Sequence, residues 1–439
     1  MINKKLIKTY VKELYNIRSL LNFISSQNQF LKDTFVLISG TFIAQLIPVV
    51  ITPILTRLYI PEDFGIYALF MAIIFILGSI SCGRYELAIM LPKKNDYALN
   101  IFALGFIINL AFSIFLLVLI TFLHDYLAKI INNPHFSALS YFIPINVFLI
   151  GLSNLLNYLN NRFGYYKNLS KAKVYKAIAM SFTQVVLGMF KLGAAALIIA
   201  QTFSQFVYSV KLFYLFRKNE KCILKKINKA LIISLAKRYS YFPKFSMWGI
   251  LINNLAKNLT TILISYFYGN KILGFYNLAQ RVLELPLNFI ATSFSQVFFY
   301  QATKEKHRTG KATKIFTYAL STLTVISLPI FIILFFFIKK LFVFFFGEQW
   351  KVAGIYAKIL IPLVFVKFIV ISVMVIDTIF EKQKFYLFSQ VILFLGNILL
   401  LVLLKSQPFE KYLIFSVLFN IFFYLSYLLA LINFARGNQ

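Results

Sequence analysis

The sequence predicts an all-α integral membrane protein, and three features support this fold class. Of its 439 residues, 60% are hydrophobic, and the mean hydropathy is +0.78. Runs of about 20 apolar residues, the length that a helix needs to cross a hydrocarbon core of about 30 Å, recur along the chain. Lys and Arg number 45 against 14 Asp and Glu. Since such proteins retain basic loops in the cytoplasm, the net charge of +31 indicates topology and no nucleic-acid partner.

The apolar runs predict about twelve transmembrane helices. We expect them near residues 35–56, 66–83, 99–123, 141–160, 174–190, 192–216, 245–267, 275–300, 315–338, 354–377, 385–404 and 412–433. With a cytoplasmic N-terminus, the inner segments hold about 30 of the 45 Lys and Arg residues, and the outer loops hold about nine. This bias predicts a multi-pass protein with both termini in the cytoplasm.

Two basic segments lie outside the predicted spans. Residues 1–32 alternate apolar and Lys positions at helical spacing, which predicts a basic amphipathic N-terminal extension on the inner leaflet, with a disordered tail as the alternative. The extension has neither the apolar region nor the cleavage site of a signal peptide. The cytoplasmic linker 217–244 holds nine cations. It separates an N-lobe, 33–216, from a C-lobe, 245–439, with six predicted helices in each.

The two lobes match each other without gaps at an offset of 209 residues. Five positions are identical and three more are polar in both: Gly40/Gly249, Tyr59/Tyr268, Gly65/Gly274, Tyr67/Tyr276, Leu69/Leu278, Gln45/Asn254, Thr52/Thr261 and Thr56/Ser265. The first and seventh helices should both run outward, so we expect parallel repeats related by a pseudo-two-fold axis along the membrane normal. Transporters built from such repeats bind their substrate between the halves.

The seventh predicted helix contains a polar stripe. Its sequence at 251–265 is LINNLAKNLTTILIS. At 100° per residue the polar side chains fall within an arc of about 160°; they are Asn253, Asn254, Lys257, Asn258, Thr260, Thr261 and Ser265. A lysine at the bilayer centre costs about 2.5–3.5 kcal/mol, so Lys257 should face protein or water.

Two helices of the first half carry similar stripes. Their members are Thr41, Gln45, Thr52 and Thr56 on the first helix, and Asn146, Ser153, Asn154, Asn157, Asn160 and Asn161 on the fourth. Three stripes, two of them related by the repeat, favour a hydrated cavity between the lobes. The alternative for any one side chain is a hydrogen bond between helices, which contributes less than about 1 kcal/mol.

The ionisable residues within the predicted spans are mostly cationic. Lys257 and Lys367 lie near mid-membrane and Arg281 lies nearer the outside, where we expect it to pair with Glu284, three residues on. Cations beside amides and hydroxyls favour a phosphorylated, sugar-bearing substrate over a hydrophobic cation. The substrate-binding candidates are Lys257, Asn253, Asn254, Asn258, Thr261, Gln45, Thr52, Asn154, Asn157, Lys367 and Arg281.

Other chemistry is not indicated by the sequence. With three His, no Walker A pattern and no metal-ligand cluster, we expect no catalytic centre, nucleotide or metal. Directional transport would then need an ion gradient, with Glu284 and Asp377 as candidate carriers. Arg57 lies in the outer turn after the first helix, and Arg84 and Glu86 form the inner mouth after the second. Gating and helix-end anchoring are both open for these three.

Four segments resemble a known family. They are DTFVLISGTFIAQLIPVVITPILTRLYIPEDFGIYALF (33–70), RYELAIMLPKKNDYALN (84–100), YNLAQRVLELPLNFIATSFSQVFF (276–299) and FEKQKFYL (380–387), and they are similar to the O-antigen flippases, the Wzx-type proteins of polysaccharide export. The resemblance implies a flippase of the multidrug/oligosaccharidyl-lipid/polysaccharide superfamily in the bacterial inner membrane, whose two lobes surround a central cavity. Its implied substrate is an undecaprenyl-pyrophosphate-linked oligosaccharide. Membrane lipids, the polysaccharide polymerase and the chain-length machinery are the further partners.

Other functions fit parts of this pattern. A lipid II flippase, or one for another polyprenyl lipid, would differ mainly in substrate. A multidrug antiporter of the same superfamily would usually place a carboxylate, rather than Lys257, deep in its site. A membrane glycosyltransferase, ligase or polymerase would need an extracellular catalytic loop, whereas the longest predicted outer loop, 124–140, is short. We therefore expect a transporter and not an enzyme.

Overall fold

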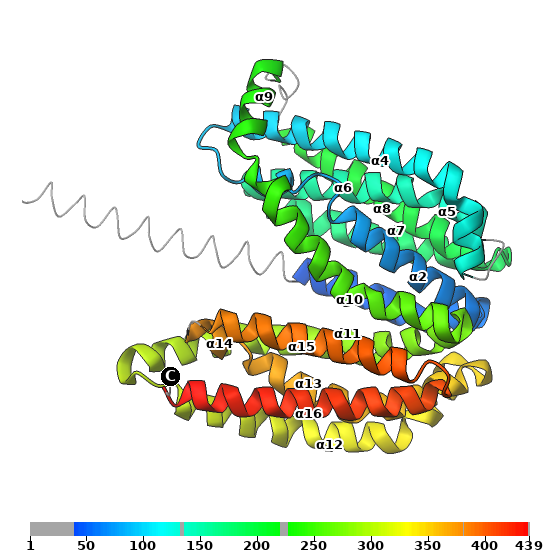
Figure 1. Ribbon diagram of the computed structural model, residues 1–439, viewed down its shortest axis with the longest axis vertical. Helices are drawn as coiled ribbons and strands as arrows, with labels where there is room; N and C mark the ends of the chain where they lie inside the picture. The colour runs from blue at the N-terminus through cyan, green and yellow to red at the C-terminus, as the bar shows by residue number, and fades with distance from the viewer. Residues whose placement is uncertain (1–38, 132–135, 220–226, 381, 438–439) are drawn as a thin grey trace, which may run out of the picture.

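The computed structural model describes residues 39–131, 136–219, 227–380 and 382–437, and all regular structure in these ranges is helical (Figure 1). Twelve of the described helices have 18 residues or more, and they correspond one to one with the twelve predicted spans. The N-lobe holds Ser39–Leu58, α2 (Pro61–Gly78), α4 (Asn95–Ile131), α6 (Phe142–Arg162), α7 (Tyr166–Met189) and α8 (Ala194–Asn219). The C-lobe holds α10 (Met247–Tyr268), α11 (Asn270–Thr309), α12 (Thr313–Phe346), α13 (Lys351–Val373), α15 (Gln383–Leu403) and α16 (Phe409–Ala435).

Shorter helices connect these long ones. They are α3 (Tyr85–Ala88), α5 (Phe136–Ser140), α9 (Lys229–Arg238), the π-helical turn η2 (Phe242–Ser246), the 3₁₀ turn η3 (Glu348–Trp350) and α14 (Ile376–Ile379). The sequence did not predict α9, because its short apolar face is hidden among the many cations of the basic linker. The predicted amphipathic extension, 1–32, lies outside the described residues.

Nine of the described helices are long and apolar enough to cross a membrane. The other three long helices, α7, α10 and α11, have sufficient length but more polar side chains. α10 carries the predicted polar stripe, and α11 carries Arg281 and Glu284. Two of these three helices, α10 and α11, hold most of the candidate site.

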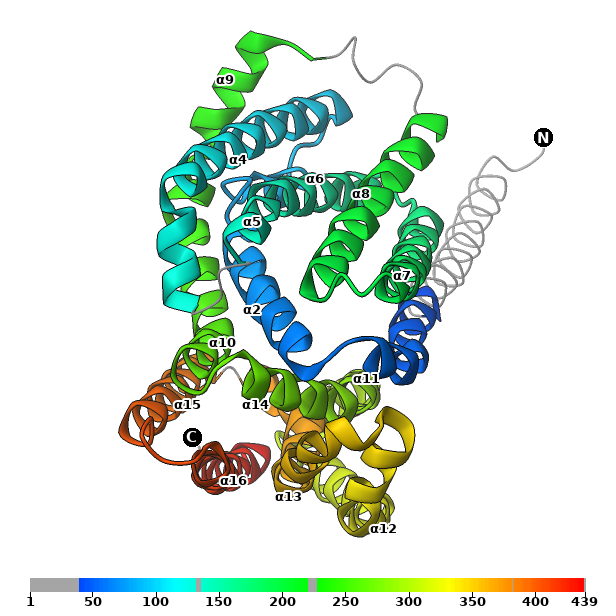
Figure 2. The same cartoon turned by 90° about the vertical axis from the view of Figure 1, so that its right-hand side faces the viewer.

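The two lobes meet along α2, α10 and α11. α2 packs against both C-lobe helices, and Figure 2 shows these helices between the rest of the N-lobe and the rest of the C-lobe. The lobes converge where Leu58 connects to Pro61 and where Tyr268 connects to Asn270, and they diverge toward the opposite end (Figure 1). We call the first the closed end and the second, with α3 and α9, the open end.

Two glycines form a reciprocal contact at the closed end. A Cβ atom on Gly65 would overlap the backbone oxygen of Asn270, and one on Gly274 would overlap that of Pro61. Gly65 and Pro61 are offset by 209 residues from Gly274 and Asn270, so each contact is the image of the other. Such self-complementary pairing is the signature of a two-fold axis, and it places the pseudo-two-fold axis at this crossing.

A second contact joins the lobes at the closed end. The carbonyl of Thr56 lies in the last turn of the first helix. The amide of Ile60, four residues on, would donate to this carbonyl if the helix continued, but it donates to the Asp63 carboxylate at 3.1 Å. Terminal carbonyls of a helix need partners from elsewhere. Gln349 and the indole of Trp350 both donate to this oxygen, the latter at 2.9 Å, and Trp350 is fully buried. The C-lobe thereby completes the hydrogen bonding of an N-lobe helix.

Candidate functional site

The polar face of α10 is open at one end and covered at the other. Asn253 and Lys257 are exposed, and the space beside Gly249 is empty to at least 4 Å. Ile264 lies on the same face, two turns after Lys257, and it is fully buried. Because α10 also packs against α2, we infer that this face turns toward the N-lobe and that Lys257 lies where the lobes diverge.

The remaining members of the α10 stripe are half-buried, except Ser265, which is buried and donates to the side-chain oxygen of Asn270 at 2.6 Å. Asn254, Asn258 and Thr261 lie on the flank of the exposed face, and Asn258 donates to the backbone oxygen of Asn254 at 2.9 Å. Lys257 makes no hydrogen bond or ion pair with any residue that the structure describes. Its ammonium group is thus available to a ligand.

Glu284 does not pair with Arg281, so that prediction was wrong. The Glu284 carboxylate lies 2.8 Å from the ammonium group of Lys367 on α13, and both side chains are 27% exposed. α11 and α13 pack along their length, which brings a cation from another helix to the carboxylate. The expected i, i+3 pair uses only local spacing, and such pairs contribute no more than about 0.5 kcal/mol.

Arg281 lies instead at the surface between the lobes. Among the described residues no carboxylate lies within ion-pair distance of it, and it interacts electrostatically with Tyr67 on α2. Tyr67 in turn contacts Gln201 at 3.3 Å. The pairing of Glu284 with Lys367 therefore leaves Arg281 as a second cation without a carboxylate.

The stripe of the first helix is buried in one half only. Thr52 and Thr56 are buried, and their hydroxyls donate to the carbonyls of Pro48 and Pro53, at 2.6 and 3.0 Å. Prolines at 48 and 53 remove two amides from the helix ladder. Gln45 is exposed. Only the half of this stripe nearer the open end is thus accessible to a ligand.

The stripe of α6 makes contacts within the N-lobe. Asn146 donates to Thr202 at 2.7 Å and Ser153 accepts from Gln205, both on α8. Asn157 contacts the hydroxyl of Tyr208 at 3.4 Å, and Asn154 is half-buried. Hydrogen bonds between α6 and α8, the alternative to a cavity, thus account for three of the six members of this stripe.

Three N-lobe lysines were not among the sequence candidates. The Lys173 ammonium lies 3.0 Å from the Thr41 hydroxyl on the first helix. Lys176 and Lys211 lie over the rings of Tyr208 and Tyr175, at 5.3 and 4.1 Å from the ring centres. The sequence held a signal for them, because 126–283 contains Glu220 as its one acidic residue. Cations in that stretch cannot find carboxylates nearby in sequence, so they bind hydroxyls and aromatic faces instead.

Asp377 lies at the open end of the C-lobe, between α13 and α15. Its carboxylate accepts hydrogen bonds from Tyr427 at 2.8 Å and from Thr378 at 3.0 Å, and it borders a cavity of about 240 Å³. Ser295 and Tyr386 line the same cavity. The arrangement offers several oxygen atoms to a small cation, and among the described residues no group of three or more His, Cys, Asp or Glu could hold a metal ion.

The predicted mouth residues occupy opposite ends. Arg57 is exposed at the closed end. Arg84 has a left-handed backbone, with φ of 63°, and its guanidinium lies 3.2 Å from the buried carboxylate of Glu86. Burial raises the pKa of Glu86 above its ordinary value, although Arg84 opposes this shift. The second carboxylate oxygen of Glu86 has no hydrogen-bond partner among the described residues.

Taken together, the surface between the lobes has two cations without carboxylates, Lys257 and Arg281, beside a stripe of amides and hydroxyls. Glu284, three residues after Arg281, is neutralised by Lys367 of α13. This arrangement suits an anion that also carries hydrogen-bonding groups.

Comparison with known proteins agrees with this architecture. Residues 54–354 match the family model described as polysaccharide biosynthesis protein. Teichuronic acid biosynthesis protein TuaB of Bacillus subtilis is 27% identical over 192 residues, which are 43% of this chain and 38% of TuaB. The match therefore spans well under half of that relative.

Two solved structures share the fold at low sequence identity. An inward-facing multidrug resistance MATE family transporter of the MOP superfamily has a TM-score of 0.68 at 13% identity, covering 90% of this chain and 97% of its own. The lipid II flippase MurJ in an inward closed conformation has a TM-score of 0.66 at 13% identity, covering 91% and 90%. With the fold of these transporters and a family match over most of its length, the chain belongs to the polysaccharide biosynthesis protein family.

Proposed function

We propose that the protein is a flippase for an undecaprenyl-pyrophosphate-linked oligosaccharide, of the O-antigen (Wzx) type. The observation that carries the proposal is the pair of cations without carboxylates, Lys257 and Arg281, on the C-lobe helices that face the N-lobe. A pyrophosphate supplies several charged oxygen atoms to such groups. Asn253, Asn254 and Gln45 would meet sugar hydroxyls, and the polyprenyl chain would remain in the lipid.

Transport would proceed by alternating access about the glycine crossing. In the described conformation the closed end is held by the Gly65 and Gly274 contacts and by the hydrogen bonds to Thr56. The substrate would enter from the open end and bind at Lys257. Release would require the closed end to separate and the open end to approach, so the two ends are never open together.

The predicted topology gives this cycle a direction. With both termini cytoplasmic, in the bacterial inner membrane, the open end faces the cytoplasm, where lipid-linked repeat units are assembled. The product leaflet would then be periplasmic, within reach of the polymerase and chain-length machinery. An ion gradient through Glu284 or Asp377 would drive directional flipping. Asp377 is the better candidate for binding a cation, because the Glu284 carboxylate already forms an ion pair with Lys367.

Two other substrates are consistent with the fold. Lipid II carries the same pyrophosphate, so the cations would serve it equally. A multidrug antiporter would bind a lipophilic cation, which two unneutralised cations between the lobes disfavour. Anionic lipid-linked sugars therefore fit the site better than cationic drugs.

Translocation by purified protein in proteoliposomes tests the proposal. Fluorescent undecaprenyl-pyrophosphate oligosaccharide in one leaflet should become accessible to a glycosidase on the other side, with and without a proton or sodium gradient. A lipophilic dye cation serves as the competing substrate and empty liposomes as the control. Movement of the dye, with no movement of the lipid-linked sugar, would show an antiporter and overturn the proposal.

A further inference from the structure

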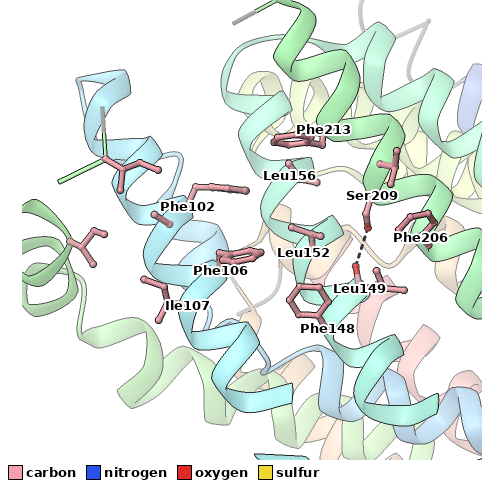
Figure 3. A pocket seen from close by; sticks show the side chains of 14 residues that line it. Phe102, Phe106, Ile107, Phe148, Leu149, Leu152, Leu156, Phe206, Ser209 and Phe213 are labelled. Atoms are coloured by element: carbon pink, nitrogen blue, oxygen red, sulfur yellow. Dashed lines mark hydrogen bonds between the residues drawn. The ribbon is translucent and has the colours of Figure 1, made fainter. Parts of the chain in front are cut away.

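A separate apolar groove lies on the N-lobe, away from the site between the lobes. It has a volume of about 530 Å³ and lies between α4, α6 and α8. Figure 3 shows Phe106 of α4 and Phe148 of α6 pointing into this space, with Phe213 of α8 at its far end. The one polar side chain in its lining, Ser209, is satisfied by the carbonyls of Leu149 and Gln205 at 3.3 and 3.0 Å. The groove thus has no free polar group and suits a hydrocarbon chain.

The groove is open to the surroundings of the protein. Ile107 and Phe206 on its two walls are 54% and 51% exposed. Figure 2 shows α4, α6 and α8 on the side of the N-lobe away from the C-lobe. A substrate bound at Lys257 between the lobes would therefore not place its polyprenyl chain here. Lipid of the surrounding bilayer has direct access.

Helix α9 closes one end of the groove. Ile227 and Ile232 line it from this side. The helix is firmly attached, because the Asn228 amide donates to Asn100 of α4 at 2.8 Å and the Tyr85 hydroxyl donates to the Ala236 carbonyl at 3.1 Å. α9 is thus a fixed end wall, at the end of the protein that the charge bias predicts to be cytoplasmic.

Cations gather at this end wall. Phe206, Val210, Phe213 and Arg217 follow one another at spacings of four, three and four residues, so the exposed Arg217 continues the groove wall on α8. The exposed Lys229 lies one turn before Ile232 on α9. The described residues of 217–238 include five cations and no acid, and Lys93 and Lys94 outnumber Asp96 at the start of α4. A hydrocarbon groove that ends at cations is complementary to an anionic amphiphile.

We propose that this groove binds an anionic glycerophospholipid of the inner leaflet. One acyl chain lies between α4, α6 and α8, and the phosphate lies against Arg217 and Lys229. Basic pockets between transmembrane helices on the cytoplasmic side recognise anionic headgroups in this way. The site is independent of the proposed flipping reaction, since it shares no residue with the surface between the lobes.

Lipid titration of the purified full-length protein tests the proposal. Phosphatidylglycerol and phosphatidylcholine with identical chains are added in detergent, and retained lipid is counted by native mass spectrometry. Phosphatidylglycerol should bind more tightly. Arg217→Gln with Lys229→Gln should weaken that binding about thirtyfold, whereas the control pair Lys304→Gln with Lys311→Gln should not. Val210→Trp should fill the groove and abolish binding, whereas Val325→Trp, an exposed valine on α12, should not.

Two outcomes would overturn the proposal. One is equal retention of both phospholipids, or equal effects of the two double variants, since the headgroup would then have no site at α9. The other is displacement of phosphatidylglycerol by undecaprenyl phosphate at lower concentration, with loss in Val210→Trp, since the groove would then hold the substrate's chain. Normal thermal unfolding of each variant excludes misfolding as the cause of lost binding.

Discussion

The first two helices of each lobe are related by the repeat, yet they differ in what their side chains do. Both pairs keep the glycine crossing, Gly65 in one and Gly274 in the other. The charges embedded along the helices lie on the second pair. At the offset of 209 residues, Lys257 corresponds to Pro48, Arg281 to Ala72 and Glu284 to Phe75.

This difference separates two roles of the repeated helices: the backbone crossing between the lobes and the proposed ligand site. In the proposed cycle the lobes rock about the backbone crossing, which would then have to remain two-fold, and the crossing is kept in both halves. A ligand site needs no such symmetry. The first pair buries its hydroxyls at Thr52 and Thr56 against its own carbonyls, and the second presents Lys257 to an open surface. In the proposed function the glycine crossing is therefore a symmetric pivot, and the surface at Lys257 is an asymmetric site.

The largest effect should come from the pivot. Gly65→Ala and Gly274→Ala each place a Cβ against a backbone oxygen, of Asn270 or Pro61, which cannot move as a side chain can. Each should destabilise the protein by about 3 kcal/mol, the upper part of the range for overpacking. Gly249→Ala meets nothing within 4 Å and should gain up to about 1 kcal/mol from helix propensity. Thermal unfolding in detergent measures all three, and unequal losses at 65 and 274 would break the symmetry argument.

The charge pair of the C-lobe should give the next largest effect. Lys367→Gln leaves the Glu284 carboxylate without its cation, and we expect a loss of about 2 kcal/mol, below the range for fully buried pairs because both groups are partly exposed. Adding Glu284→Gln should recover most of that loss. A double-mutant cycle with additive losses would show that the two residues do not act as a pair.

The contact between the lobes at Thr56 should have a smaller effect. Trp350→Phe keeps an aromatic ring but removes the N–H donor, at a cost of about 1 kcal/mol, which raises the population of the separated closed end about fivefold. Spin labels at the exposed positions Lys191 and Lys405 report that separation. Trp248→Phe, at an exposed tryptophan of the open end, is the matched control. If the distances between the two spin labels have the same distribution in both variants, the Trp350 hydrogen bond does not contribute to holding the closed end together.

The smallest effect should depend on pH and come from the inner mouth. Burial raises the pKa of Glu86, so the folded protein holds this proton more tightly than the unfolded chain does. Stability should then fall as pH rises from the ordinary pKa of 4.5 to the raised value. Glu86→Gln should remove this dependence, whereas Glu410→Gln, at an exposed acid, should keep it. Unfolding temperatures between about pH 4 and 8 measure it, and a wild-type stability that rises over that window would contradict the sign.

Most of the helices were predictable because they are long apolar runs whose length matches the bilayer, and α7, α10 and α11 were found by length despite their polar side chains. The residues at which the helices end were less predictable. α11 continues to Thr309 and α12 to Phe346, past the predicted ends at 300 and 338, because lysines and arginines at a membrane surface still favour helix. α9 was missed for the opposite reason, since its apolar face is only a few residues long.

The candidate site was predictable in composition but not in pairing. Periodicity placed Lys257 and its neighbours on one face, because that depends on the helix alone. Which carboxylate neutralises which cation depends on packing between helices, so Glu284 was assigned to Arg281 and binds Lys367. The burial of Thr52 was not predictable either, because the periodicity of the first helix does not indicate which half of its polar stripe is covered by other helices.

The proposed pyrophosphate site at Lys257 is tested most directly by equilibrium binding of undecaprenyl pyrophosphate to the purified protein. A charge-assisted contact is worth about 1.5–3 kcal/mol, so Lys257→Gln should weaken binding roughly ten- to a hundredfold. Lys257→Arg should retain most of the affinity, as should Lys304→Gln, which removes a lysine elsewhere. A stable Lys257→Gln protein that binds as tightly as the wild type would contradict the account, and the polar face of α10 would then serve packing alone.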